Sequence, residues 1–77
     1  MAKRSMYTVW VDNYIGEPEL IFTAPTFRAK AQVFEYAKSL LTLPAYYQCR
    51  ILVRKVFIRD GVVDENCIEW EFTDEDL

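Results

Sequence analysis

The feature that most constrains this chain is an Asp-Gly pair, Asp60-Gly61, that lies between two long runs of β-forming residues. The first run extends from Tyr47 to Arg59 and the second from Val62 to Thr73. An Asp-Gly pair flanked in this way is the strongest short-range signal for a β-hairpin with a two-residue turn. The sequence therefore predicts a long hairpin, around which the rest of the chain is arranged.

A two-residue turn determines which residues of the two strands lie opposite each other. Arg59 then faces Val62, and counting back along both strands places Ile51 opposite Trp70. A slip by one residue would turn Trp70 toward water, so the register is strongly specified. The apolar pairs of this register share one face of the hairpin, and they are Cys49 with Phe72, Ile51 with Trp70, and Val53 with Ile68.

Nearer the turn, the apolar residues change face. Val56, Ile58 and Val63 fall on the outer face, whereas Lys55 falls on the face of the core. Two explanations are open: a β-bulge near Arg54-Lys55 re-aims the strand, or the tip of the hairpin leaves the core as an arm. The first strand spans roughly 43 Å at about 3.3 Å per residue. A helix of about 17 residues spans only about 25 Å, so we expect the tip to project beyond the helix.

The first half of the chain supplies two further strands and one helix. Met6–Val11 alternates, and Glu19–Thr23 is a short second strand that pairs with it in antiparallel fashion. The helix is expected from Phe27 to Thr42, with Thr26 as N-cap, and it ends before Pro44. The order β-β-α-β-β predicts an α+β fold, a four-stranded antiparallel sheet in the order 2-1-3-4 with the helix on one face. The other face is open to solvent or to a partner.

Periodicity predicts which side chains lie between the sheet and the helix. In the first strand we expect Tyr7, Val9 and Val11 to face the helix, and Trp10 to be partly covered on the opposite face. The apolar arc of the helix is about 220° wide, which is more than a single sheet face needs. Either the loops cover the flank of the helix, or a partner does.

The composition restricts the class of function. The 77 residues contain no histidine, which removes the commonest general base and metal ligand. We therefore predict that the chain is not an enzyme and has no cofactor and no metal ion. The predicted register places Cys49 and Cys67 on opposite faces and several pairs apart, so we expect two reduced thiols. We expect a single domain over residues 1–77, with a flexible tail at 1–5 and an acidic tail at 74–77. Without a membrane span or a secretory signal, the expected location is cytoplasmic.

The charge is unevenly distributed along the hairpin. Residues 41–60 carry four basic residues and one acidic residue, whereas residues 61–77 carry seven acidic residues and no basic one. We predict a partner-binding surface that mixes arginine, aromatic and acidic side chains, as interface anchors do. This surface depends on the register above, and a pairing of Ile51 with any residue but Trp70 would contradict it. Its candidate residues are Arg50, Arg54, Lys55, Phe57, Arg59, Glu69, Glu71, Asp74, Glu75 and Asp76.

Two functions follow from this surface. The first is a small non-catalytic protein-binding module, a monomer or weak homodimer, that occludes a functional surface of a larger complex. The alternative is a single-stranded nucleic-acid-binding protein that uses the basic strand 50–59, although Glu69 and Glu71 would then lie beside the phosphates.

The format of the chain resembles that of a group of known inhibitors. A very small acidic chain with two hairpins around one helix, over Met6 to Thr73, is similar to the small phage-encoded inhibitors of bacterial defence, anti-CRISPR proteins among them. No sequence motif is shared. The resemblance implies a viral inhibitor that acts in the host cytoplasm and blocks a nucleic-acid-binding or assembly surface of a larger complex. It assigns no role to any individual residue.

Overall fold

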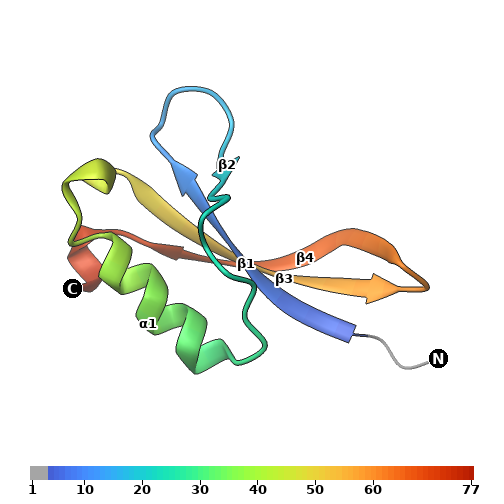
Figure 1. Cartoon of the computed structure of the whole chain (residues 1–77). Coiled ribbons are helices and arrows are strands. Elements are labelled where there is room, and N and C mark those ends of the chain that lie inside the picture. Colours follow the sequence, from blue (N-terminus) through green and yellow to red (C-terminus); the bar gives the residue numbers. More distant parts are fainter. Residues whose placement is uncertain (1–3) are drawn as a thin grey trace.

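The computed structural model describes residues 4–77, except for the side chains of residues 64–67. Four strands form one antiparallel sheet in the order β2-β1-β3-β4, and a single α-helix lies on one face of it (Figure 1). The predicted α+β architecture and strand order are therefore confirmed. The elements are β1 (Arg4–Asp12), β2 (Glu19–Leu20), α1 (Lys30–Leu40), β3 (Arg50–Arg59) and β4 (Val62–Phe72), with short 3-10 helices at Pro44–Tyr46 and Asp74–Asp76.

The core lies between α1 and the facing side chains of the three long strands. As predicted, Tyr7 and Val9 are buried on this face, while Trp10 is half-buried on the other. The ring of Phe34 on α1 meets the edges of Trp70 and Phe72, with centroid distances of 5.3 and 5.0 Å. The buried apolar residues of this core are Tyr7, Val9, Ile21, Val33, Ala37, Leu40, Leu41, Ile51, Val53 and Phe72.

The three long strands continue past α1 as a projecting arm (Figure 1). The β3–β4 hairpin turns at Asp60 and Gly61, whose φ angles of 52° and 79° suit the mirror-image turn that hairpins prefer. The first residues of β1 pair with the same part of β3, up to Arg4 opposite Ile58. The arm therefore has three strands. It is defined here as residues 4–6, 55–59 and 62–64, and the side chains of 4–6, 55–59, 62 and 63 are described.

The predicted hairpin register holds only next to the turn. Pairing follows it as far as Phe57 opposite Asp64, and the next regular pair is Lys55 opposite Ile68. One residue of β3 and three residues of β4 lie between these two pairs. The irregularity that the sequence placed near Arg54-Lys55 on β3 therefore has its extra residues on β4.

Beyond this irregularity, the predicted pairing is wrong by two residues. Ile51 lies opposite Phe72 rather than Trp70, and Val53 lies opposite Trp70. The sequence could not reveal this, because a shift of two leaves the alternation of a strand unchanged. Trp70 and Phe72 therefore still point toward α1, but the register on which the predicted binding surface depended is contradicted.

The helix begins three residues later than predicted. Phe27 forms a bridge to β1, in which its N–H donates to the carbonyl of Tyr7 at 3.1 Å and its carbonyl accepts the N–H of Tyr7 at 2.8 Å. This extended geometry excludes a helix at Phe27. The N-cap is Ala29 rather than Thr26, and no side chain caps the helix.

Both ends of the described chain are more regular than the predicted tails. Arg4 and Ser5 belong to β1, and residues 1–3 lie outside the described residues. At the other end, the N–H of Thr73 donates to Asp76 Oδ2 at 2.7 Å, which holds Asp74–Asp76 in a 3-10 turn.

Candidate protein-interaction surface

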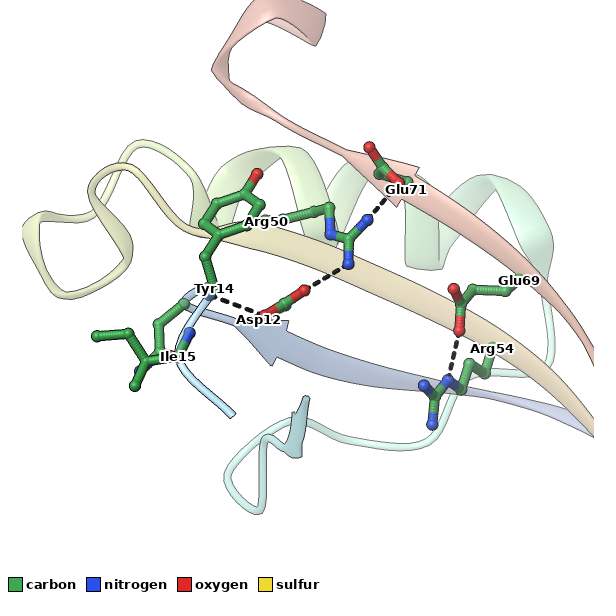
Figure 2. A network of polar contacts seen from close by, with 8 residues as sticks. Asp12, Tyr14, Ile15, Arg50, Arg54, Glu69 and Glu71 are labelled. Carbon is green, nitrogen blue, oxygen red and sulfur yellow. Dashed lines mark hydrogen bonds and ion pairs between the residues drawn. The ribbon is translucent and has the colours of Figure 1, made fainter. Parts of the chain in front are cut away.

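The outer face of the sheet, opposite α1, carries a network of ion pairs near the β1–β2 loop (Figure 2). Arg50 on β3 donates from Nη1 to Glu71 Oε2 at 2.7 Å and from Nη2 to Asp12 Oδ2. Asp12 Oδ1 also accepts the backbone N–H of Tyr14 at 2.8 Å. That N–H and the Arg50 guanidinium hold the pKa of Asp12 below its ordinary value. Asp12 is only 6% exposed, so it is a fixed part of the fold.

A second pair continues this network along β3 (Figure 2). Arg54 Nε donates to Glu69 Oε2 at 2.7 Å, and its guanidinium lies 4.4 Å from the ring centroid of Trp10. Leu52 lies between Arg50 and Arg54 on the same face and is 1% exposed. On this half of the outer face, the arginines are therefore paired within the chain, and the leucine between them is buried.

The network changes the interpretation of four predicted site residues. Arg50, Arg54, Glu69 and Glu71 do share one face, but they bind one another within the chain. Asp12, which joins them, was not among the predicted residues. Alternation along β1 places Asp12 on the same face as Trp10, yet its pairing with Arg50 depends on the β1–β3 register, which no local signal supplies.

The other predicted site residues lie in separate places. Lys55 and Phe57 are on the face of the arm that looks toward the helix side, with Lys55 Nζ 5.5 Å from the Phe57 ring centroid. Arg59 is exposed at the tip of the arm. The acidic residues Asp74, Glu75 and Asp76 are exposed at the opposite end of the molecule (Figure 1). The ten predicted residues therefore do not form one surface.

The outer face of the arm carries apolar residues, and no ion pair joins the side chains described there. Cross-strand pairing places Met6 beside Val56, and Ile58 between Arg4 and Val63. As the sequence predicted, Val56, Ile58 and Val63 are on this face. Val63 is 53% exposed, and α1 lies on the opposite side of the sheet. We call Met6, Val56, Ile58 and Val63 the outer-arm patch.

Met6 is the member of the patch that sequence reasoning missed. The alternation of Arg4, Met6 and Thr8 predicts that these three share a face with Trp10. It does not reveal that this part of β1 lies beside Val56 and Ile58, because that depends on long-range pairing.

Among the described residues, no group of three or more His, Cys, Asp or Glu side chains is placed to hold a metal ion. In the same part of the chain, no helix is long and apolar enough to cross a membrane. Comparison with protein-family models, with curated proteins and with solved structures finds no significant match to this chain. Its function is therefore inferred from its own geometry.

Proposed function

We propose that this chain is a small non-catalytic protein-binding module that contacts a larger complex through the outer-arm patch and occludes a functional surface there. The observation that supports this most is the position of the patch. Its four apolar side chains lie on the outer face of a projecting arm, on the side away from α1. Val63 is exposed, and Met6, Val56 and Ile58 are half-buried. Contiguous, partly exposed apolar residues with charged neighbours are typical of protein interaction sites.

The form of the arm also suits binding. Three paired strands hold the patch, with one irregularity in the β3–β4 pairing at Val56, so little conformational entropy is lost when a partner covers it. The arm extends along the longest dimension of the molecule, 42 Å against 27 and 20 Å in the other directions. A narrow projecting element of this kind is suited to entering a groove, while the rest of the domain covers the neighbouring surface of the partner.

Single-stranded nucleic acid is the rival ligand, and the ion pairs weigh against it. A strand lying along residues 50–59 would meet Arg50 and Arg54 already bound to carboxylates, so phosphates would have to displace Glu71 and Glu69. We expect a labelled oligonucleotide to show no anisotropy change at tens of micromolar protein and moderate salt. Binding that weakens steeply as salt rises would favour the rival.

Two adjacent valines at the tip provide a matched test of protein binding. Val63 is on the outer face, whereas Val62 is 69% exposed and pairs with Arg59 on the opposite face. Each is replaced by Asp, and the variants and wild type serve as baits for lysate of the source organism, with captured proteins quantified by mass spectrometry. Val63→Asp should lose the partner that wild type and Val62→Asp retain.

The reverse result, in which Val62→Asp loses the partner and Val63→Asp retains it, would assign binding to the other face. Retention by both variants would rule out the arm as the contact surface. Both residues are exposed, so thermal unfolding of the three proteins should agree closely and exclude misfolding as the cause of any loss.

Occlusion is tested separately from binding. Once the partner is purified, its activity is measured with increasing amounts of wild type, Val62→Asp and Val63→Asp. Wild type and Val62→Asp should inhibit with equal potency, and Val63→Asp should not inhibit. If the partner binds the arm but keeps its full activity, the chain is a protein-binding module and not an inhibitor.

A further inference from the structure

A hollow of about 440 Å³ opens beside the outer-arm patch, at the free edge of β1. It forms because the bridge between Phe27 and Tyr7 brings the segment before α1 alongside β1. In an antiparallel bridge of this kind, the neighbours Thr26 and Arg28 lie toward the face that carries Met6. The residues that line the hollow are Arg4, Ser5, Met6, Thr26, Arg28 and Ile58.

The lining combines two guanidinium groups with an apolar wall. Arg4 and Arg28 are both exposed, and neither forms an ion pair with any described side chain. Among the described side chains, no Asp or Glu lines the hollow. Met6 and Ile58 are shared with the outer-arm patch, so the hollow and the patch are continuous. In the network on the same face, by contrast, Arg50 and Arg54 are each paired with a carboxylate.

Two arginines without an ion-pair partner among the described side chains, beside two hydroxyl side chains, favour an anionic oxygen ligand. A guanidinium presents several N–H donors in a fixed plane that matches a carboxylate, and the hydroxyls of Ser5 and Thr26 are further donors. The apolar wall favours a carboxylate carried by a peptide over a phosphate in a nucleic acid backbone. Because Ile58, Arg4 and Arg28 line the same hollow, one peptide can contact the apolar wall and a guanidinium together.

We propose that this hollow receives an Asp or Glu side chain of the partner, from an acidic segment whose neighbouring apolar residues lie on the outer-arm patch. The inference rests on the proposed function, because it names the chemistry of the partner at that same surface. The acidic segment is recognised by Arg4 and Arg28 together, and the patch supplies the apolar contact.

The test uses a display library of short peptides of random sequence, selected on the full chain. Wild type should enrich peptides that carry Asp or Glu next to apolar residues. The best of these is then synthesised, and its affinity is measured by titration calorimetry. Arg4→Gln and Arg28→Gln should each weaken binding about tenfold, because each removes charge-assisted hydrogen bonds to the carboxylate.

Lys38→Gln is the matched control, since it makes the same change in net charge in the last turn of α1. It should leave the affinity unchanged. A second synthetic peptide, with each carboxylate replaced by its amide, should bind wild type about as weakly as the original peptide binds the arginine variants. Amide NMR spectra of all variants verify that the fold is intact.

The possible results separate the two proposals. If the enriched peptides bind wild type, Arg4→Gln and Arg28→Gln equally but lose affinity for Val63→Asp, the hollow is overturned and the patch stands. Enrichment of basic or neutral peptides also overturns the hollow. If Val63→Asp weakens the binding of none of the peptides selected on wild type, the outer-arm patch is not a contact surface either. If the chain self-associates as its concentration rises, and Arg28→Gln abolishes this association, then the hollow binds a second copy of the chain and not an acidic partner.

Discussion

The two halves of the outer sheet face are built on the same strands and behave differently. Near the β1–β2 loop, every charged side chain of β3 on this face has a counter-ion, and Leu52 beneath them is 1% exposed. On the arm, the same face presents Ile58 and Val63 with Arg4 unpaired among the described side chains. The comparison shows that the number of charges along a strand does not indicate which of them are available to a partner.

The neighbouring strands cause this difference. Around Arg50, β1 contributes Asp12 and β4 contributes Glu71, so the guanidinium has a carboxylate on each side. Around Ile58, β1 contributes Arg4 instead. One half of the face is therefore stabilised by ion pairs within the chain, whereas on the other half Arg4 has no ion-pair partner among the described side chains.

The largest expected effect contrasts two apolar residues on this face. Leu52→Ala should lower the free energy of unfolding by about 2–4 kcal/mol, because it opens a cavity beneath the ion pairs. Val56→Ala, on the half-buried arm, should cost less than about 1 kcal/mol. Urea unfolding followed by tryptophan fluorescence measures both. Equal losses would mean that the arm is as tightly packed as the body of the domain.

The next prediction concerns the pH dependence that Asp12 contributes. Its pKa is lower in the folded than in the unfolded state, so ionised Asp12 stabilises the fold above its unfolded pKa. This contribution is lost as the pH falls through the folded value, below about pH 4. The melting temperature of wild type should therefore fall more steeply in that range than that of Asp12→Asn. Parallel curves for the two proteins would show that the network does not depend on this carboxylate.

A smaller effect separates two arginines on β3. Arg54→Met removes the pair with Glu69 and the contact with the Trp10 ring, and should cost about 1 kcal/mol. Arg59→Met, at the exposed tip, should change stability by less than about 0.5 kcal/mol. Denaturant unfolding at low and high salt measures both, and salt should reduce only the Arg54 effect. A larger loss for Arg59→Met would contradict the division of the face.

The smallest expected effect is a gain of stability in the half that α1 covers. Ala29 is an N-cap without a side-chain acceptor, so Ala29→Asp should stabilise by about 0.5–1 kcal/mol. Thr26→Ala should lose no capping energy, since Thr26 precedes the Phe27 bridge. Amide hydrogen exchange should slow in the first turn of α1 and stay unchanged in the arm. If Thr26→Ala instead speeds amide exchange in the first turn of α1, Thr26 caps the helix as the sequence predicted.

Local signals predicted most of the fold. The Asp60-Gly61 turn, the alternation in β1 and the stop before Pro44 each depend on a few adjacent residues, and they led to the correct order of elements. The start of α1 was predicted wrongly because Phe27 bonds to Tyr7, twenty positions earlier in the chain. The same limit explains the candidate site. Its residues on the outer face were found by alternation, but their partners, Asp12 above all, depend on strand pairing over long distances.

The irregularity in β4 has a consequence for how this domain can change. Its extra residues come as an even number, so the strand re-enters the sheet with every side chain on its original side. Adding or deleting one residue there would exchange inside for outside along the whole remainder of β4, whereas adding or deleting two would change only the size of the irregularity. The irregularity is therefore a position where β4 can vary in steps of two residues and keep the same side chains against α1.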